Sequence, residues 1–234
     1  MVRMPKKFRM AFLLFSVCFI RSSLGFYAED SSLLARLEPI EAYGETPNRN
    51  LEQWKKEISA YSLRHYGVAT FAIDPTVIIL HYTASDDFPL NLISSASFKD
   101  EAPGVASHFV IDEKDGEGIV YQILPLEVMS RATFGANFCS ISIEMVARDE
   151  ATLLSKRALL ETTITLVCEL MERYEIPVTR VYGHEEIDAF LADDPHGVFF
   201  DNTIEGLFLP RKIDPGKRVM SYIRERLDAK GVQQ

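Results

Sequence analysis

Four consecutive apolar residues, Val77 to Leu80, stand directly before a histidine, and this run is the strongest constraint on the fold. A strand that is apolar on both faces has to lie inside a sheet that is covered on both sides. The stretch 77–85 therefore predicts a buried central strand, and Pro75 just before it is typical of a strand start. His81 would then end this strand, where open α/β sheets usually bind ligands. A lone histidine at such a place is more often a satisfied core residue than a ligand.

The rest of the chain alternates between helical and extended patterns. Apolar residues recur at helical spacing in three segments: 51–61, 152–174 and 217–227. Extended patterns mark four further segments: 107–111, 119–124, 141–146 and 178–182. Turn residues around Asp115-Gly116 join two of these strands into a hairpin. We therefore expect an α/β fold, a single domain with a central mixed β-sheet of five or six strands flanked by helices.

The length and the amino terminus suggest the domain organisation. A chain of 234 residues, 47% of them hydrophobic, is long enough for one substantial core. Residues 1–25 hold basic residues before a short apolar segment, which predicts a signal peptide. We expect an N-terminal extension with an amphipathic helix over 26–70 and the main domain over 71–230. The protein would be periplasmic or secreted, with a retained anchor as the alternative because Arg21 directly follows the apolar segment.

The charge of the mature chain excludes some classes of partner. Residues 1–25 hold five basic and no acidic residues, so their removal leaves 20 Lys and Arg against 34 Asp and Glu. Affinity for phosphates comes from Lys and Arg, so we expect neither nucleic acid nor an anionic membrane as the main partner. The apolar segment is shorter than the roughly 20 residues of a membrane helix, so we expect no stable span after signal cleavage. Cys139 and Cys168 either pair or remain buried free thiols.

Two histidines, His81 and His184, both end predicted strands, and together they are a better ligand signal than either alone. A catalytic zinc site takes three N or O ligands and keeps one position open for water. Asp214 offers a third ligand. Pro215 favours an extended backbone before it, in which Lys212 and Asp214 point the same way. The alternative is that Asp214 is an ordinary turn residue and Lys212 an exposed charge.

Glu144 is unusual because glutamate is depleted in strands. It lies in the middle of the predicted strand 141–146, on the face opposite Ile143 and Met145. A solvent-facing position on an edge strand would explain it. Next to a metal-activated water, however, a carboxylate on a rigid strand is suited to act as a general base.

Several motifs in the chain agree with one family. They are His81-Tyr82-Thr83-Ala84, Ser107-His108-Phe109, Tyr121-Gln122-Ile123-Leu124-Pro125, Asn137 with Ser140-Ile141-Ser142-Ile143-Glu144, Gly183-His184, and Arg211-Lys212-Ile213-Asp214-Pro215-Gly216. In this order they resemble the zinc-dependent N-acetylmuramoyl-L-alanine amidases (amidase type 2), a family that includes bacterial cell-wall recycling amidases, certain phage lysozymes and the peptidoglycan recognition proteins. The resemblance covers about residues 75–220.

The resemblance implies a reaction and a set of roles. His81, His184 and Asp214 would hold one Zn²⁺ per chain, Glu144 would act as the base toward the attacking water, and Lys212 would stabilise the oxyanion. The reaction would hydrolyse the amide bond between N-acetylmuramic acid and L-alanine in peptidoglycan or muropeptides. The alternatives are a non-catalytic peptidoglycan-binding protein and a zinc peptidase that cuts within the stem peptide.

The resemblance also implies contacts to the substrate. Tyr82, His108 and Asn137 are predicted to contact it, with His108 as an outer-shell residue or, in a three-histidine site, as a ligand in place of Asp214. The chain departs from the family pattern at 131–135, where Arg-Ala-Thr-Phe-Gly replaces the frequent Trp-His-Ala-Gly segment.

The spacing of the third ligand is a further departure from the family pattern. Asp214 lies thirty residues after His184, whereas the bacterial enzymes typically place the ligand about ten residues after this histidine, where Asp194 stands here. We prefer Asp214, because Asp194 has Ala192 where the family's lysine should be. Residues 188–209 would then be an insertion beside the site, acting as a lid, a wall of the glycan groove or a packed surface loop.

Overall fold

The computed structural model describes residues 34, 50–89, 96–193 and 212–231, except the side chains of 191–193. The predicted signal peptide and residues 194–209 of the predicted insertion, Asp194 among them, lie outside the described residues, whereas residues 188–193 are described. The predicted bounds of the extension and of the main domain remain predictions. Within the described residues, no helix combines the length and the apolar character needed to cross a bilayer.

A mixed five-stranded sheet forms the centre of the fold, as the sequence predicted. Its strands are β1 (Val77–Tyr82), β2 (Phe109–Lys114), β3 (Glu117–Gln122), β4 (Ser140–Met145) and β5 (Val181–Gly183), in the order β3-β2-β4-β1-β5. Strand β3 pairs antiparallel with β2, and all other pairs are parallel. Strand β1 is an inner strand between β4 and β5, so the prediction of a buried strand is confirmed, although β4 holds the middle position.

The predicted hairpin is present, and its strands β2 and β3 approach the turn more closely than the predicted extended segments 107–111 and 119–124. Only Asp115 and Gly116 lie between the strands, with φ angles of 54° and 79°. Two consecutive residues with positive φ make the turn whose twist matches the flanking strands. The strands consequently extend to Lys114 and begin again at Glu117.

The helices are α2 (Leu51–Tyr66), α4 (Glu150–Ser155), α5 (Arg157–Tyr174), α6 (Ile187–Asp193) and α7 (Lys217–Ala229), with short 3₁₀ turns η1 (Val178–Arg180) and η2 (His184–Glu186). The prediction of one continuous helix over 152–174 is wrong, because Lys156 leaves the helical conformation with φ −85° and ψ 78°. Its ammonium donates to the carbonyl of Val146 at 2.7 Å. This contact ties the break between α4 and α5 to the end of β4.

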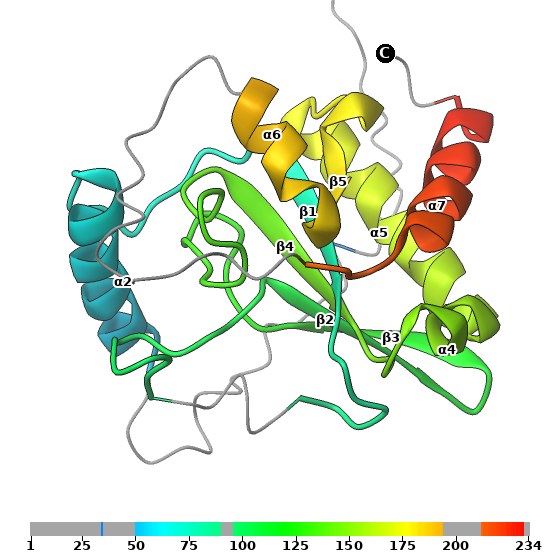
Figure 1. The fold of residues 1–234 in the computed structure, drawn as a ribbon, viewed down its shortest axis with the longest axis horizontal. Coiled ribbons are helices and arrows are strands. Elements are labelled where there is room, and N and C mark those ends of the chain that lie inside the picture. The colour runs from blue at the N-terminus through cyan, green and yellow to red at the C-terminus, as the bar shows by residue number, and fades with distance from the viewer. Residues whose placement is uncertain (1–33, 35–49, 90–95, 194–211, 232–234) are drawn as a thin grey trace, which may run out of the picture. The chain divides into compact units, whose positions relative to one another are not determined.

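Helices cover both faces of the sheet (Figure 1). One face, with Leu80, Phe109 and Ile143, packs against the apolar sides of α5 and α7. On the other face α2 buries Trp54 and Ile58, and the Trp54 indole donates to the carbonyl of Met129 at 3.0 Å. The predicted amphipathic helix of the N-terminal extension is thus part of the described core.

A second apolar cluster lies on the same face of the sheet as α2, between β1 and α6. Val77 and Ile79 of β1 pack there with Ile187 and Phe190 of α6. Side chains alternate between the faces of a strand, so His81 lies on the same side of β1 as Val77 and Ile79. The site described next therefore lies on the face of the sheet that carries both α2 and α6.

Candidate metal centre and active site

Three side chains from distant parts of the sequence meet at the carboxyl end of β1. His81 is on β1, His184 is the first residue of η2 directly after β5, and Asp214 precedes α7. Because Leu80 and Gly183 are paired in the parallel strands β1 and β5, the residue that follows each of them emerges at the same sheet edge. The topology of the sheet thus brings the two histidines together.

The segment that carries Asp214 is fastened directly to η2. The Asp214 carbonyl accepts a hydrogen bond from the Glu185 N–H at 2.9 Å, and the Gly216 N–H donates to the Glu185 carboxylate at 2.6 Å. A Cβ on Gly183 would lie 2.9 Å from the Pro215 ring. Glycine at this position allows the Asp214 segment to pack against the turn that carries His184.

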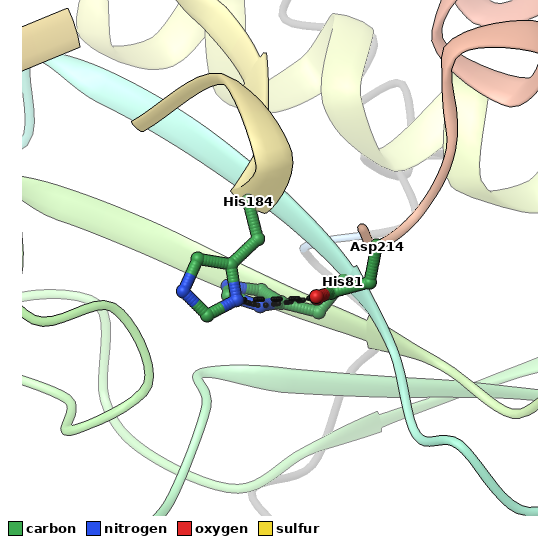
Figure 2. A group of neighbouring side chains, drawn as sticks. All are labelled: His81, His184 and Asp214. Atoms are coloured by element: carbon green, nitrogen blue, oxygen red, sulfur yellow. Dashed lines mark hydrogen bonds and ion pairs between the residues drawn. The ribbon is translucent and has the colours of Figure 1, made fainter. Parts of the chain in front are cut away.

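The three donor atoms form a small triangle (Figure 2). The Nδ1 atoms of His81 and His184 are 2.9 Å apart, and Oδ2 of Asp214 lies 3.3 Å from the first and 3.1 Å from the second. Two ring nitrogens at this distance repel each other through their lone pairs unless a proton or a cation lies between them. The side chains are also shielded from solvent, since His81 is 2% and His184 7% exposed.

The donor set fits zinc. Tetrahedral coordination with bonds of about 2.0–2.1 Å separates two ligand atoms by about 3.3 Å, close to the separations within the triangle. Two imidazoles and one carboxylate also leave a fourth position for water or substrate, as in catalytic zinc sites. His81, His184 and Asp214 are therefore the residues that would hold the ion.

The local electrostatics keep the ring of His184 neutral and the carboxyl group of Asp214 ionised near neutral pH. Burial, together with the charge on His81, lowers the pKa of His184 to about 4. Burial by itself would raise the pKa of Asp214, but hydrogen bonds with His184 and His81 outweigh it and hold this pKa well below its usual range. Metal binding requires neutral imidazole and ionised carboxylate, and the cluster favours both states.

Glu144 is the register partner of His81 on the neighbouring strand β4. Its Oε2 atom is buried and has no hydrogen-bond partner among the described residues. Burial raises the pKa of Glu144, against the opposing effects of His81 and Lys212. The expectation that it faces away from Ile143 and Met145 is confirmed, because both of those residues belong to the core on the α5 side.

A cavity of about 640 Å³ opens in front of these groups, and all the predicted site residues except His108 line it. Lys212 and Tyr82 are half-buried at its wall, next to the donor cluster. The cavity also includes groups that sequence reasoning missed, among them Tyr61 of α2 and the loop residues Phe98 and Lys99. No local motif marks them, because they reach the site only through the packing of α2 and of the loop before β2.

Asn137 lines the cavity, but both its amide oxygen and its amide nitrogen also bond to the protein. Its Oδ1 accepts from the N–H groups of Ala132 and Thr133 at 3.0 and 2.8 Å, and its Nδ2 donates to the Tyr61 hydroxyl at 3.3 Å. The amide therefore braces the 131–137 loop against α2. A direct contact of Asn137 with substrate stays a prediction.

His108 lies in the core and not at the cavity. It is 0% exposed, its Nε2 lies 3.0 Å from the Val128 carbonyl and its Nδ1 accepts from the Ser142 N–H at 3.1 Å. Neither ring nitrogen is left for a ligand or substrate, so the arrangement favours a structural role over the predicted contact. Cys139 and Cys168 are both free thiols, but only Cys139 is buried, whereas Cys168 is half-buried.

Comparison with known families identifies the chain. Residues 72–217 match the family model described as N-acetylmuramoyl-L-alanine amidase, which is more than half of the chain. The chain belongs to this family. The match begins after α2, so Tyr61 lies outside the part of the chain that the family model covers.

Several solved structures are similar to the chain. N-acetylmuramoyl-L-alanine amidase LysC from Clostridium intestinale URNW is 19% identical, with a TM-score of 0.47 over 68% of this chain and 93% of that one. AmiD from E. coli, solved with anhydro-N-acetylmuramic acid-L-Ala-D-gamma-Glu-L-Lys, is 24% identical, with a TM-score of 0.37 over 53% of each chain. PlyL is 23% identical, with a TM-score of 0.38 over 55% of this chain and 83% of that one. No curated protein matches the chain.

Proposed function

We propose that this protein is a zinc-dependent N-acetylmuramoyl-L-alanine amidase that cuts the bond between N-acetylmuramic acid and L-alanine in peptidoglycan or muropeptides. Family membership supports the amidase activity. The observation that carries the zinc-dependent chemistry is the triangle of His81, His184 and Asp214 beside the buried Oε2 of Glu144, to which no described residue hydrogen-bonds. We further propose that residues 1–25 export the protein to the periplasm or the medium.

Zinc, when bound, would activate a water molecule and polarise the scissile carbonyl. Glu144 would accept the proton of the attacking water. This role is supported by its position beside His81 and by an oxygen that has no hydrogen-bond partner within residues 50–89, 96–193 and 212–231. Burial raises the pKa of Glu144 toward neutral pH. A general base works best when its pKa is near the pH at which the enzyme operates. The same carboxyl group, once protonated, can return the proton to the leaving nitrogen of L-alanine.

Lys212 would stabilise the negative charge that develops on the carbonyl oxygen. Its ammonium lies near enough to lower the pKa of both Glu144 and His184 through its charge. A fixed positive charge in a partly buried site stabilises a developing oxyanion more than the ground-state carbonyl. Lys212 and Asp214, two residues apart in one segment, thus place a cation and a metal ligand at the same wall of the cavity.

The proposal is tested by incubating the purified protein, loaded with zinc, with peptidoglycan and with soluble muropeptides. Mass spectrometry should detect free stem peptides that begin with L-alanine, together with sugars that keep their lactyl group. Fragments cut inside the stem peptide would instead identify a peptidase. Binding to peptidoglycan without any released peptide would contradict an enzymatic role.

A further inference from the structure

His81 is held at both of its ring nitrogens. While Nδ1 faces His184 and Asp214, Nε2 lies 3.0 Å from the hydroxyl of Thr133. Thr133 is 0% exposed, so no solvent competes for this contact. Thr133 stands in the 131–135 stretch where the sequence departs from the family pattern.

The position of Nδ1 determines which ring nitrogen of His81 carries the proton. A nitrogen that serves as a metal ligand needs its lone pair, so the proton of the neutral ring must be on Nε2. This N–H then donates to the Thr133 hydroxyl. Removing the hydroxyl would leave a buried N–H without a partner and would allow the other tautomer or a rotated ring.

Thr133 is itself held in place by a chain of hydrogen bonds that reaches α2. Its backbone N–H donates to Oδ1 of Asn137 at 2.8 Å, and Nδ2 of Asn137 donates to the Tyr61 hydroxyl at 3.3 Å. Tyr61 also packs against the guanidinium of Arg131, 4.7 Å from its ring centre. The 131–137 loop is thereby fixed from both its ends to the helix before the family-matched region.

We propose that Thr133 is a positioning residue that fixes the tautomer and orientation of His81 for the metal, and that Tyr61 supports it from α2 through Asn137. The inference rests on the metal site of the proposed function. It adds that a helix outside the family-matched residues contributes to the geometry of that site.

The test measures the affinity of the purified protein for Zn²⁺ alone, by competition with a chromophoric chelator. Thr133→Val should weaken zinc binding about 10–100-fold, the usual cost of losing an outer-shell partner. Thr133→Ser keeps the hydroxyl and should stay close to the wild-type affinity. Thr163→Val is the matched control, because Thr163 is equally buried but donates to Leu159 within α5.

A second readout does not depend on catalysis. Nitrogen NMR of the His81 ring in the zinc-loaded protein should show a protonated Nε2 in the wild type and in Thr133→Ser, and a mixture in Thr133→Val. The inference is overturned if Thr133→Val matches the wild type in zinc affinity and in tautomer, or if Thr133→Ser loses as much affinity as Thr133→Val. It is overturned together with the metal site if the wild type binds no zinc.

These outcomes are separate from a failure of the proposed reaction. A wild-type protein that binds zinc and shows the expected Thr133 effects, yet releases no stem peptide, would overturn the amidase activity and leave the positioning role intact. If Thr133→Val keeps both the zinc affinity and the tautomer of the wild type, in a protein that does release stem peptide, the positioning role is overturned and the amidase activity is retained.

Discussion

His81 and Glu144 are direct neighbours on the parallel strands β1 and β4, and their side chains leave the sheet on the same side. His81 belongs to the donor triangle, and Glu144 has a buried oxygen that finds no hydrogen-bond partner in the part of the chain that the structure describes. The separation of the proposed metal ligand from the proposed base is therefore set by the fixed spacing of two strands. Sites built on strands in this way hold their geometry more rigidly than sites built on loops.

Glu144→Gln should abolish catalysis while it preserves the metal site. The amide has the shape of the carboxylate but cannot accept the proton, so kcat should fall by about 10²–10⁴-fold. Zinc affinity should stay within about threefold, because Glu144 is not in the triangle. Stem-peptide release and chelator competition measure the two quantities, with Glu117→Gln, an exposed residue of β3, as the control. A variant with wild-type kcat would exclude Glu144 as the base.

Asp214→Asn should weaken zinc binding by more than about 100-fold, since even outer-shell changes cost 10–100-fold. The matched control is Asp188→Asn, because Asp188 lines the same cavity but does not belong to the triangle. If only the negative charge of the cavity mattered, both variants would lose affinity equally. If Asp214→Asn kept its zinc and Asp194→Asn lost it, the third ligand would be Asp194.

Lys212→Met should lower kcat by about 10²–10³-fold and leave zinc affinity nearly unchanged, because the ammonium acts on the developing oxyanion. Lys212→Arg should recover part of the rate, since it restores the charge with a different shape. Lys217→Met, an exposed lysine at the start of α7, serves as the control. A Lys212→Met enzyme with normal kcat but a raised KM would show that the residue only binds substrate.

Gly183→Ala should disturb the metal site by pushing away the Pro215 ring, which would lie 2.9 Å from the new Cβ. Because Pro215 follows Asp214 directly, we expect weaker zinc binding together with a stability loss of about 1–3 kcal/mol, the usual cost of overpacking. Chelator competition and urea denaturation measure both effects. Unchanged values for both would mean that the segment moves without cost.

Acid should destabilise the protein through His108. Burial lowers the pKa of this imidazole to about 4, compared with 6.5 in the unfolded chain. Between these values the unfolded chain binds more protons than the folded one, so the contribution present above about pH 6.5 is lost as the pH falls toward 4. It amounts to about 3 kcal/mol over the whole range.

Urea denaturation of the zinc-free protein at several pH values measures this contribution. His108→Gln keeps a donor for the Val128 carbonyl but does not titrate, so its stability should fall less steeply with acid than that of the wild type. Parallel curves for the two proteins would show that other buried groups cause the acid sensitivity.

Local sequence determined the elements of this fold that depend on short-range periodicity and turn chemistry. The apolar run before His81 and the Asp115-Gly116 turn predicted a buried strand and a hairpin, and both are present. Backbone geometry repeats every two residues in a strand, so such signals are contained within a few positions. The break at Lys156 escaped prediction because a contact with the distant Val146 accompanies it.

The sequence predicted the candidate ligands of the site but not how they are brought together. Its candidate ligands were named from strand ends and from family motifs, but their meeting at one point depends on the order of the strands and on the packing of the Asp214 segment against η2. Tertiary structure alone placed His108 in the core and connected Tyr61 and Thr133 to His81. Contacts between residues 50 or more positions apart arise from the packing of whole elements, and no local pattern records them.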